Sequence, residues 1–405
     1  MFILMMSCLT VNIQATEEGA QPEEAVEEND VADEENSETI KEEKKGPVYI
    51  ETRGKIIEAG EPVEEELGPV KNIVQEVKVK ITEGEYNGEE YTTIFVVSYD
   101  IEAKIIGYEL SPGDRVIVQI IEDDSGNVTA TVIDFVRSGY VVGITILFLF
   151  SVILVGGKKG IKAIIALIVT IILIYFVLLK SIYNGYDTIW SSIGTAVLII
   201  ISTLIIIGGI NKKVLTAIIG TAGGVILAGI IATIFNYFAK MSGACEEAIQ
   251  LSINMTVVNF NFKDLLFSGI MIAALGASMD VGMSIASSLD EIKTKLSTIT
   301  WKELFKSGMN IGKDAIGTMT NTLILAYVGS SITLILLFMA CDMSIVDIFN
   351  KETIVQEVIL AIAGTMGVVY TVPITSITYA MLNKDKTVYK TKTESRIDGQ
   401  RSLKL

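Results

Sequence analysis

The central part of the chain is a succession of long apolar stretches. A helix that crosses a bilayer needs about 20 mostly apolar residues, and seven stretches meet this requirement. The expected spans are residues 140–157, 161–180, 189–209, 214–238, 264–288, 315–341 and 357–382. The first four are the most apolar, and Ala163–Leu179 contains no charged residue. The pattern predicts a mainly α, polytopic transmembrane helical bundle with about seven spans.

The stretch before the first span has a different pattern, in which apolar and polar residues alternate. Val77, Val79 and Ile81 are separated by single polar residues, and 128–132 repeats the pattern. Alternation with period two is typical of strands with one buried face. Turn signals such as Asn87-Gly88 separate the alternating runs. About five short strands are expected, forming a small β-barrel-like domain that resembles an OB-fold.

Composition divides the chain into five segments. Residues 1–15 are signal-like, and residues 16–46 form an acidic linker that is too poor in apolar residues to fold. Residues 47–136 form the β-domain, residues 137–385 the transmembrane helical domain, and residues 386–405 a basic tail. The net charge of −16 comes largely from the linker, where residues 17–45 hold 13 acidic residues against three lysines.

The distribution of basic residues between the expected spans predicts the orientation. The loops after the first, third and fifth spans, together with the tail, hold 16 lysines and arginines, whereas the opposite loops hold four. Cytoplasmic loops are enriched in lysine and arginine. The protein is therefore expected in the cell membrane, with the β-domain extracytoplasmic and the C-terminus cytoplasmic.

The rare residues limit the chemistry. The chain has no histidine, and its three cysteines, Cys8, Cys245 and Cys341, form no C-x-x-C pair. Histidine-based zinc sites and Ser-His-Asp triads are thereby excluded, and no cofactor or metal is expected. Cys245 and Cys341 are both expected on the outer side, either as a disulfide or as two thiols. Since no basic patch carries interleaved aromatic residues, nucleic-acid binding is not expected.

One acidic residue lies well inside the fifth expected span. Asp280 shares a helical face with Ser284, Ser287 and Ser288, which follow at four, seven and eight residues. An ionised carboxylate in hydrocarbon is costly unless it is paired or hydrated, so such residues usually serve a function. Asp280 is therefore a candidate ion- or substrate-binding group.

A second polar stripe is expected around the start of the sixth span. Asn310, Asp314, Thr318 and Asn321 recur there at helical spacing, with Lys313 adjacent and Tyr327 further out. If the two stripes face each other, they form an intramembrane polar seam. Pro373, in the seventh span, removes a helix hydrogen bond and frees a carbonyl, and broken helices with intramembrane carboxylates are typical of ion-coupled carriers. A structural interpretation, in which Asp280 pairs with Lys313, stays open.

Two long segments carry a recognisable motif: GASMDVGMSIASSLDE, from Gly276 to Glu291, and NIGKDAIGTMTNTLILAY, from Asn310 to Tyr327. Both resemble the YibE/F-like family of bacterial multi-pass membrane proteins. The segment Ile133–Arg137 is similar to that family as well. The resemblance covers roughly residues 48–385 and implies a multi-pass protein with an extracytoplasmic β-region. The activity of the family is largely uncharacterised, so the resemblance assigns no catalytic residue.

Three functions are consistent with these features. The first is a transporter or permease for a small solute or ion that uses the polar seam. The second is a structural or signalling subunit whose β-domain binds a membrane or extracytoplasmic protein partner. The third is an intramembrane enzyme with Asp280 and Asp314 as a carboxylate pair. The residues around both acids do not match intramembrane aspartyl proteases, so the chain is not expected to be an enzyme.

Overall fold

The computed structural model describes residues 48–67, 70–98, 108–122, 127–244 and 261–383. The expected signal-like segment, acidic linker and basic tail lie outside these residues. The chain divides into two compact units, residues 1–148 and 149–405, and each is described here by itself. We call them the β-unit and the helical unit.

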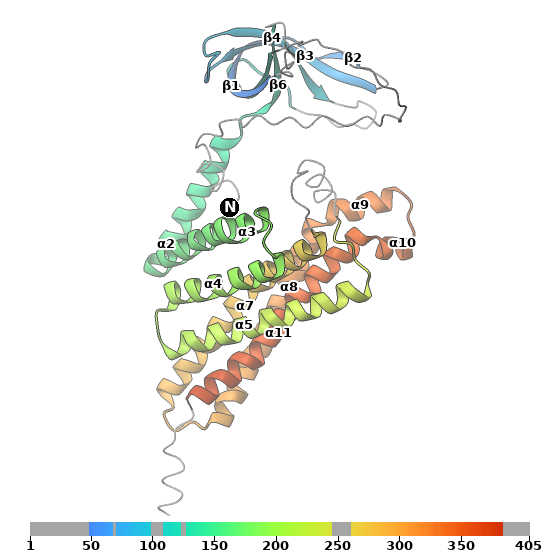
Figure 1. Cartoon of the computed structure of the whole chain (residues 1–405). Helices are drawn as coiled ribbons and strands as arrows, with labels where there is room; N and C mark the ends of the chain where they lie inside the picture. Colours follow the sequence, from blue (N-terminus) through green and yellow to red (C-terminus); the bar gives the residue numbers. More distant parts are fainter. Residues whose placement is uncertain (1–47, 68–69, 99–107, 123–126, 245–260, 384–405) are drawn as a thin grey trace, which may run out of the picture. The chain divides into compact units, whose positions relative to one another are not determined.

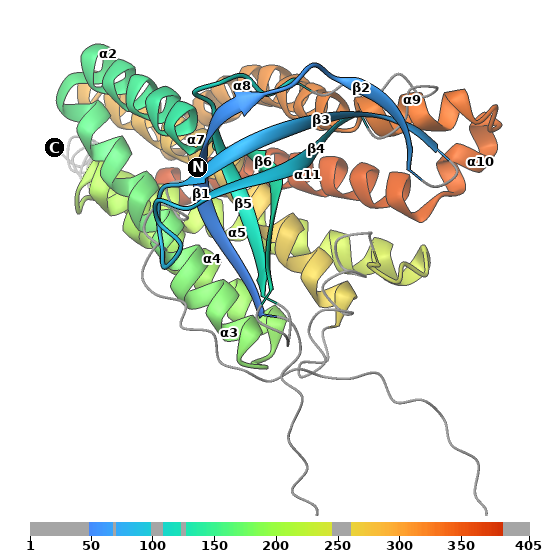
Figure 2. The same ribbon diagram turned by 90° about the horizontal axis from the view of Figure 1, so that it is seen from above.

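The β-unit is a single antiparallel sheet of six strands in its described part (Figure 1). The strands are β1 (Val48–Ala59), β2 (Val63–Leu67), β3 (Val70–Ile81), β4 (Glu90–Ser98), β5 (Arg115–Glu122) and β6 (Val128–Phe135). Their order is β2-β3-β1-β5-β6, and β4 pairs with β3 outside this path. Figure 2 shows the strong twist of the sheet, since its β2–β3 end and its β5–β6 end run in different directions.

The core of the β-unit lies on one face of this sheet, as alternation predicts. Val77, Val79 and Ile81 are buried, and Val118 and Ile120 of β5 are fully buried. The sheet curls into a half-barrel, so that Phe95 of β4 meets Phe135 of β6 edge to face, with ring centroids 5.9 Å apart. No hydrogen-bonded ladder joins β4 to β6 within the described residues. The expected barrel-like domain is thus present as an incompletely closed sheet.

One polar side chain belongs to this core. Gln75 is 3% exposed, and its amide nitrogen donates to the Gly60 and Leu110 carbonyls at 2.9 Å each. Its amide oxygen accepts the Leu110 N–H at 2.8 Å. Gln75 therefore provides hydrogen-bond partners for backbone groups at two places, the connection from β1 to β2 and the approach to β5.

The helical unit consists of the following elements, of which α2 begins in the β-unit: α2 (Ser138–Leu173), η1 (Ile174–Leu179), α3 (Lys180–Tyr183), α4 (Thr188–Gly208), α5 (Lys212–Phe238), α7 (Phe262–Lys295), α8 (Trp301–Ser330), α9 (Ile332–Ala340), α10 (Ile345–Asn350) and α11 (Glu352–Leu382). Side-chain caps fix the residues at which several of these helices begin. Asp187 accepts the Trp190 N–H, Asn211 accepts the Val214 N–H, and Thr300 forms a capping box with Glu303.

Five helical segments in the described residues are long and apolar enough to cross a membrane, or six if α8 and α9 count as one bent span. The seven expected spans are not reached for two reasons. The first two expected spans fall within one helical segment, Ser138–Tyr183, which counts once by length and composition although it turns at Gly157, the expected boundary between them. The sixth is interrupted near Ser331, where α8 and α9 meet at 52°.

A sharp turn at Gly157 divides α2. Gly157 has φ 53° and ψ −133°, a backbone conformation that side chains rarely adopt. In a continuous helix, Val152 and Gly160 would be about 12 Å apart along the axis. Instead, a Cβ on Gly160 would lie 2.3 Å from the Val152 carbonyl oxygen. The chain therefore folds back at Gly157, and the two sides of the turn pack against each other.

Glycine contacts hold the centre of the helical unit together. Helix α11 packs against α5, α7 and α8, and α4 packs against α7 (Figure 1). A Cβ on Gly224 of α5 would lie 2.0 Å from the Thr371 hydroxyl and 2.6 Å from the Gly367 carbonyl oxygen, both on α11. One on Gly220 would lie 1.9 Å from the Thr375 hydroxyl. Helices α5 and α11 therefore approach each other as closely as their backbones allow.

Candidate functional site

Asp280 lies near the middle of α7, on the face that points away from the rest of the helical unit. The buried positions of α7 around it include Ser278, Val281 and Ile285, whereas Asp280 and Ser284 are exposed. Successive helical residues are separated by about 100°. Asp280 therefore points away from the core, and the exposed stripe continues to Ser284, with half-buried Ser287 beside it.

Three polar residues of α8 also point outward. The fully buried positions of this helix are Leu304, Gly308 and Gly312, which pack toward α11 and α7. The side chains of Lys313, Asp314 and Asn321 are exposed. With 3.6 residues per turn, Asp314 and Asn321 lie on the side of α8 opposite its buried positions.

Tyr327 is placed differently from the other polar residues of α8. It is half-buried, and a Cβ on Gly364 of α11 would lie 3.3 Å from its hydroxyl oxygen. Tyr327 therefore packs at the α8–α11 contact near the end of α8, at the border of the exposed stripe.

No hydrogen bond or ion pair joins the side chains of these candidate residues to one another in the described part of the chain. The Ser288 hydroxyl donates to the Ser284 carbonyl oxygen at 3.0 Å, and the Thr318 hydroxyl donates to the Asp314 carbonyl oxygen at 3.2 Å, both within one helix. The pairing of Asp280 with Lys313 considered from the sequence is not present. Asp280 has no polar partner among the described residues, and it forms no carboxylate pair with Asp314.

Pro373 lies inside α11, which continues across it. The ring removes the N–H that would bond the carbonyl of residue 369. On either side, hydroxyl groups bond to the helix backbone: Thr371 donates to the Gly367 carbonyl oxygen at 2.8 Å and Ser376 to the Val372 carbonyl oxygen at 2.7 Å. Pro373 itself is half-buried, so this break belongs to the packed side of α11.

A buried group of hydroxyls between α5, α7 and α11 was not identified from the sequence. Thr221 donates to the Ser278 carbonyl oxygen at 3.3 Å. The hydroxyl oxygens of Ser278 and Thr375 are buried without a hydrogen-bond partner in the described residues. The pair Gly220 and Gly224, at small-xxx-small spacing, was the available signal, but spacing alone does not reveal which hydroxyls lie opposite.

Metal ligands do not gather in the described residues, where no group of three or more His, Cys, Asp or Glu side chains could hold a metal ion. Cys341 is an exposed free thiol, and Cys245 lies outside the described residues. Exposed carboxylates with helix backbone and hydroxyl oxygens nearby can bind protons or hard cations transiently.

Comparison with known proteins gives one match. A family model described as YibE/F-like protein matches residues 144–385, which include α7, α8 and every candidate site residue. The strands of the β-unit precede the matched range. No curated protein and no solved structure matches the chain.

Proposed function

Because the chain belongs to the YibE/F-like family, we propose that it is a multi-pass membrane protein that transports a small solute or ion along the polar outer stripes of α7 and α8. The observation that carries the proposal is the position of Asp280. It is a carboxylate without a polar partner among the described residues, on the outer face of an apolar helix. In a bilayer such a group needs water, a counter-charge or a transported cation.

The polar groups of the two helices have similar depths, which supports a common path. Asp280 lies 15 residues before Lys295, the end of α7, and Asp314 lies 13 residues after Trp301, the start of α8. At 1.5 Å per residue, these distances are about 22 Å and 20 Å from the short connection between the helices. Both carboxylates are therefore near mid-helix, where a transport site requires them.

The turn at Gly157 supports a seven-span arrangement within this proposal. Lys158 and Lys159 follow the turn directly, and positive residues favour the cytoplasmic side. If both arms of α2 cross the bilayer, and α8 with α9 forms one bent span, the total is seven. The β-unit is then extracytoplasmic and the tail cytoplasmic. Membrane-impermeant labelling of single cysteines at Lys159 and Glu83 in intact cells tests this, with labelling expected at position 83 alone.

The exposure of the polar side chains on α7 and α8 also supports a second function. A structural or signalling subunit would cover the outer faces of α7 and α8 with a helix of a partner protein, and polar side chains at such contacts hold membrane helices together. Lys313, Asp314 and Asn321 are suited to that role, because they are exposed and form no ion pair in the part of the chain that the structure describes. In this case the stripe is an interface, and the β-unit binds a partner outside the membrane.

The substitution Asp280→Asn separates the two functions. Reconstituted into proteoliposomes, the protein is tested for H⁺ and Na⁺ flux with ion-sensitive dyes. Transport through the stripe predicts a severe loss of flux in Asp280→Asn, because the neutral amide neither exchanges a proton nor attracts a cation. The matched control is Asp264→Asn, which neutralises an acid in the first turn of the same helix and should keep the flux.

Two results would count against transport by Asp280. Equal flux in Asp280→Asn and the unsubstituted chain removes this carboxylate from the mechanism. A stoichiometric membrane partner that co-purifies with the unsubstituted chain, and is lost from Asp280→Asn, favours the subunit function instead.

A further inference from the structure

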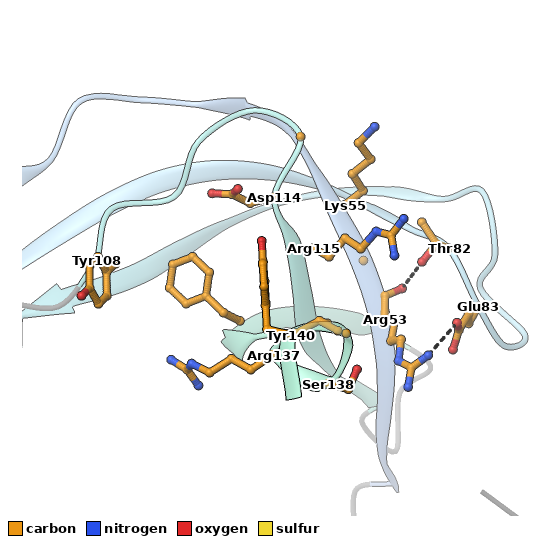
Figure 3. A pocket seen from close by; sticks show the side chains of 15 residues that line it. Arg53, Lys55, Thr82, Glu83, Tyr108, Asp114, Arg115, Arg137, Ser138 and Tyr140 are labelled. Atoms are coloured by element: carbon orange, nitrogen blue, oxygen red, sulfur yellow. Dashed lines mark hydrogen bonds and ion pairs between the residues drawn. The ribbon is translucent and has the colours of Figure 1, made fainter. Parts of the chain in front are cut away.

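The β-unit contains a cavity of about 1210 Å³. Its walls come from β1, β5, the turns before β5 and after β3, and the first turn of α2, all within residues 48–148. Four basic side chains line it, Arg53, Lys55, Arg115 and Arg137, together with the aromatic residues Tyr108 and Tyr140. In the view of Figure 3, Tyr140 stands between the Arg53–Arg115 side and Tyr108.

The arrangement of two of these cations is unfavourable by itself. Lys55 and Arg115 are register partners across the antiparallel pair β1–β5. Like charges directly opposite each other on neighbouring strands repel. Neither side chain forms an ion pair with a described residue, and both are exposed. An anion between them would be attracted by both charges at once.

The acidic residues around the cavity are engaged elsewhere. Glu83 accepts from the Arg53 guanidinium at 3.2 Å, and the Asp114 carboxylate accepts the Ser111 N–H at 2.8 Å. Asp134 bonds to Arg137, whose guanidinium also lies 5.7 Å from the centre of the Phe135 ring. Lys55 and Arg115 are therefore the two lining cations that form no ion pair with a described residue, and the lining keeps a net positive charge from four basic side chains against the carboxylates Glu83 and Asp114.

Backbone hydrogen bonds hold the cavity walls in place. The Gly113 N–H donates to the Ile56 carbonyl oxygen at 2.8 Å, and the Thr82 N–H donates to the Arg53 carbonyl oxygen at 2.8 Å. The Val136 N–H donates to the Arg115 carbonyl oxygen at 2.9 Å, which fixes the approach to α2 beside Arg115. Such pre-organised walls reduce the ordering cost of binding a ligand.

The position of the cavity along the chain selects the ligand. Ser138, Gly139 and Tyr140 line it and are also the first residues of the most apolar helical segment, Ser138–Tyr183. Tyr140 is 84% exposed, and tyrosine is favoured at the membrane–water interface. The cavity is therefore within about one helical turn of the level at which the chain would enter hydrocarbon, which is where lipid phosphates lie.

We propose that this cavity binds the phosphate headgroup of an anionic phospholipid, with Lys55 and Arg115 as the principal phosphate ligands and Tyr140 at the glycerol level. The inference requires that α2 enters the bilayer, but it is independent of transport along α7 and α8. Binding would anchor the β-unit to the membrane surface, and it would relieve the repulsion between the two opposed cations.

The test uses the full-length chain in a neutral detergent, titrated with dioctanoyl phosphatidylglycerol or dioctanoyl phosphatidylcholine, and native mass spectrometry to count bound lipid. We expect phosphatidylglycerol to bind preferentially. The double substitution Lys55→Gln with Arg115→Gln should weaken its binding about fivefold for each charge removed. The exchange Lys55→Arg with Arg115→Lys should retain it.

The matched control removes one charge from the same unit outside the cavity. Lys78 pairs with Glu90 on the neighbouring strand, does not line the cavity and lies opposite Glu58 rather than Lys55, so Lys78→Gln should leave binding unchanged, whereas Lys55→Gln alone should weaken it. Equal weakening in these two single variants would overturn the site. Equal binding of the two lipids, or displacement of the anionic lipid by millimolar inorganic phosphate, would overturn the lipid assignment.

Discussion

The β-unit and the helical unit are each stabilised internally by a different kind of packing. The β-unit buries branched aliphatic side chains, and Val79, Val118 and Ile120 have no exposed surface. In the helical unit the closest contacts are made by glycines and hydroxyls, such as Gly224 against Thr371. Many of its large apolar residues instead point outward. In the most apolar 18-residue stretch of Ser138–Tyr183, only 11% of the residues are buried.

The difference is compatible with water around the β-unit and a bilayer around the helical unit. Burying a valine or isoleucine removes apolar surface from water, which drives folding. Between helices in a bilayer this gain disappears, because lipid tails are as apolar as the side chains. Helices then associate through close van der Waals contact, for which small residues are needed. The glycine-centred packing of α5 and α11 is thus compatible with a membrane location.

The largest effect is expected from shortening a core side chain in the β-unit. Ile120→Ala should reduce the stability of that unit by about 2–5 kcal/mol, since it removes buried methyl groups and leaves a cavity. Hydrogen exchange of the full-length chain measures this as faster exchange of the β5 amides.

The control for this substitution is Ile94→Ala on the outer face of β4. Ile94 is 51% exposed, so the change should alter stability by no more than about 0.5 kcal/mol. If both variants exchange equally fast, the face assignment of the sheet is wrong.

A smaller but sharper effect is expected at the α5–α11 crossing. Gly224→Ala should destabilise the helical unit by about 1–3 kcal/mol, because the new methyl group meets the Gly367 carbonyl, which cannot move without shifting the helix. Gly269 in α7 has open space where a Cβ would lie, so Gly269→Ala should stabilise by up to about 1 kcal/mol through helix propensity.

Thermal unfolding in detergent compares the two glycine variants. The same change from glycine to alanine is thus expected to lower the unfolding midpoint at position 224 and to raise it at position 269. Equal shifts of the midpoint would mean that glycine packing does not hold this unit, and the contrast with the β-unit would be lost.

The sequence predicted the elements of both units better than it predicted how their faces are used. Period-two alternation identified the buried face of β3, because each strand residue is assigned to a face by its parity. The apolar stretches likewise matched helices. The reversal of α2 at Gly157 also falls at the expected boundary between the first two spans, residues 140–157 and 161–180, because lysines interrupt the apolar stretch there.

The candidate residues were placed on the correct helices, but their neighbours could not be derived. The common face of Asp280 and Ser284 follows from spacing alone. Whether that face meets α8 or the surroundings depends on tertiary packing, which the sequence left open. In the described residues no hydrogen bond or ion pair joins the side chains of the two stripes. The opposition of Lys55 and Arg115 depends on the pairing of strands about 60 residues apart, which no local pattern encodes.

The smallest effect is expected at the buried hydroxyl of Ser278. Ser278→Ala removes an oxygen that has no partner in the described residues, so the cost of burying it is also removed, and stability should change by less than about 0.5 kcal/mol. Ser376→Ala is the matched control, because its hydroxyl is buried as well but donates to the Val372 carbonyl oxygen. That variant should lose about 0.5–1.5 kcal/mol of stability, and both variants gain the same helix propensity.

Thermal unfolding in detergent compares the two serine variants. A larger loss in Ser278→Ala than in Ser376→Ala would mean that the Ser278 hydroxyl binds a water or cation between α5, α7 and α11, and the helical unit would then have a polar core rather than one held by close packing alone.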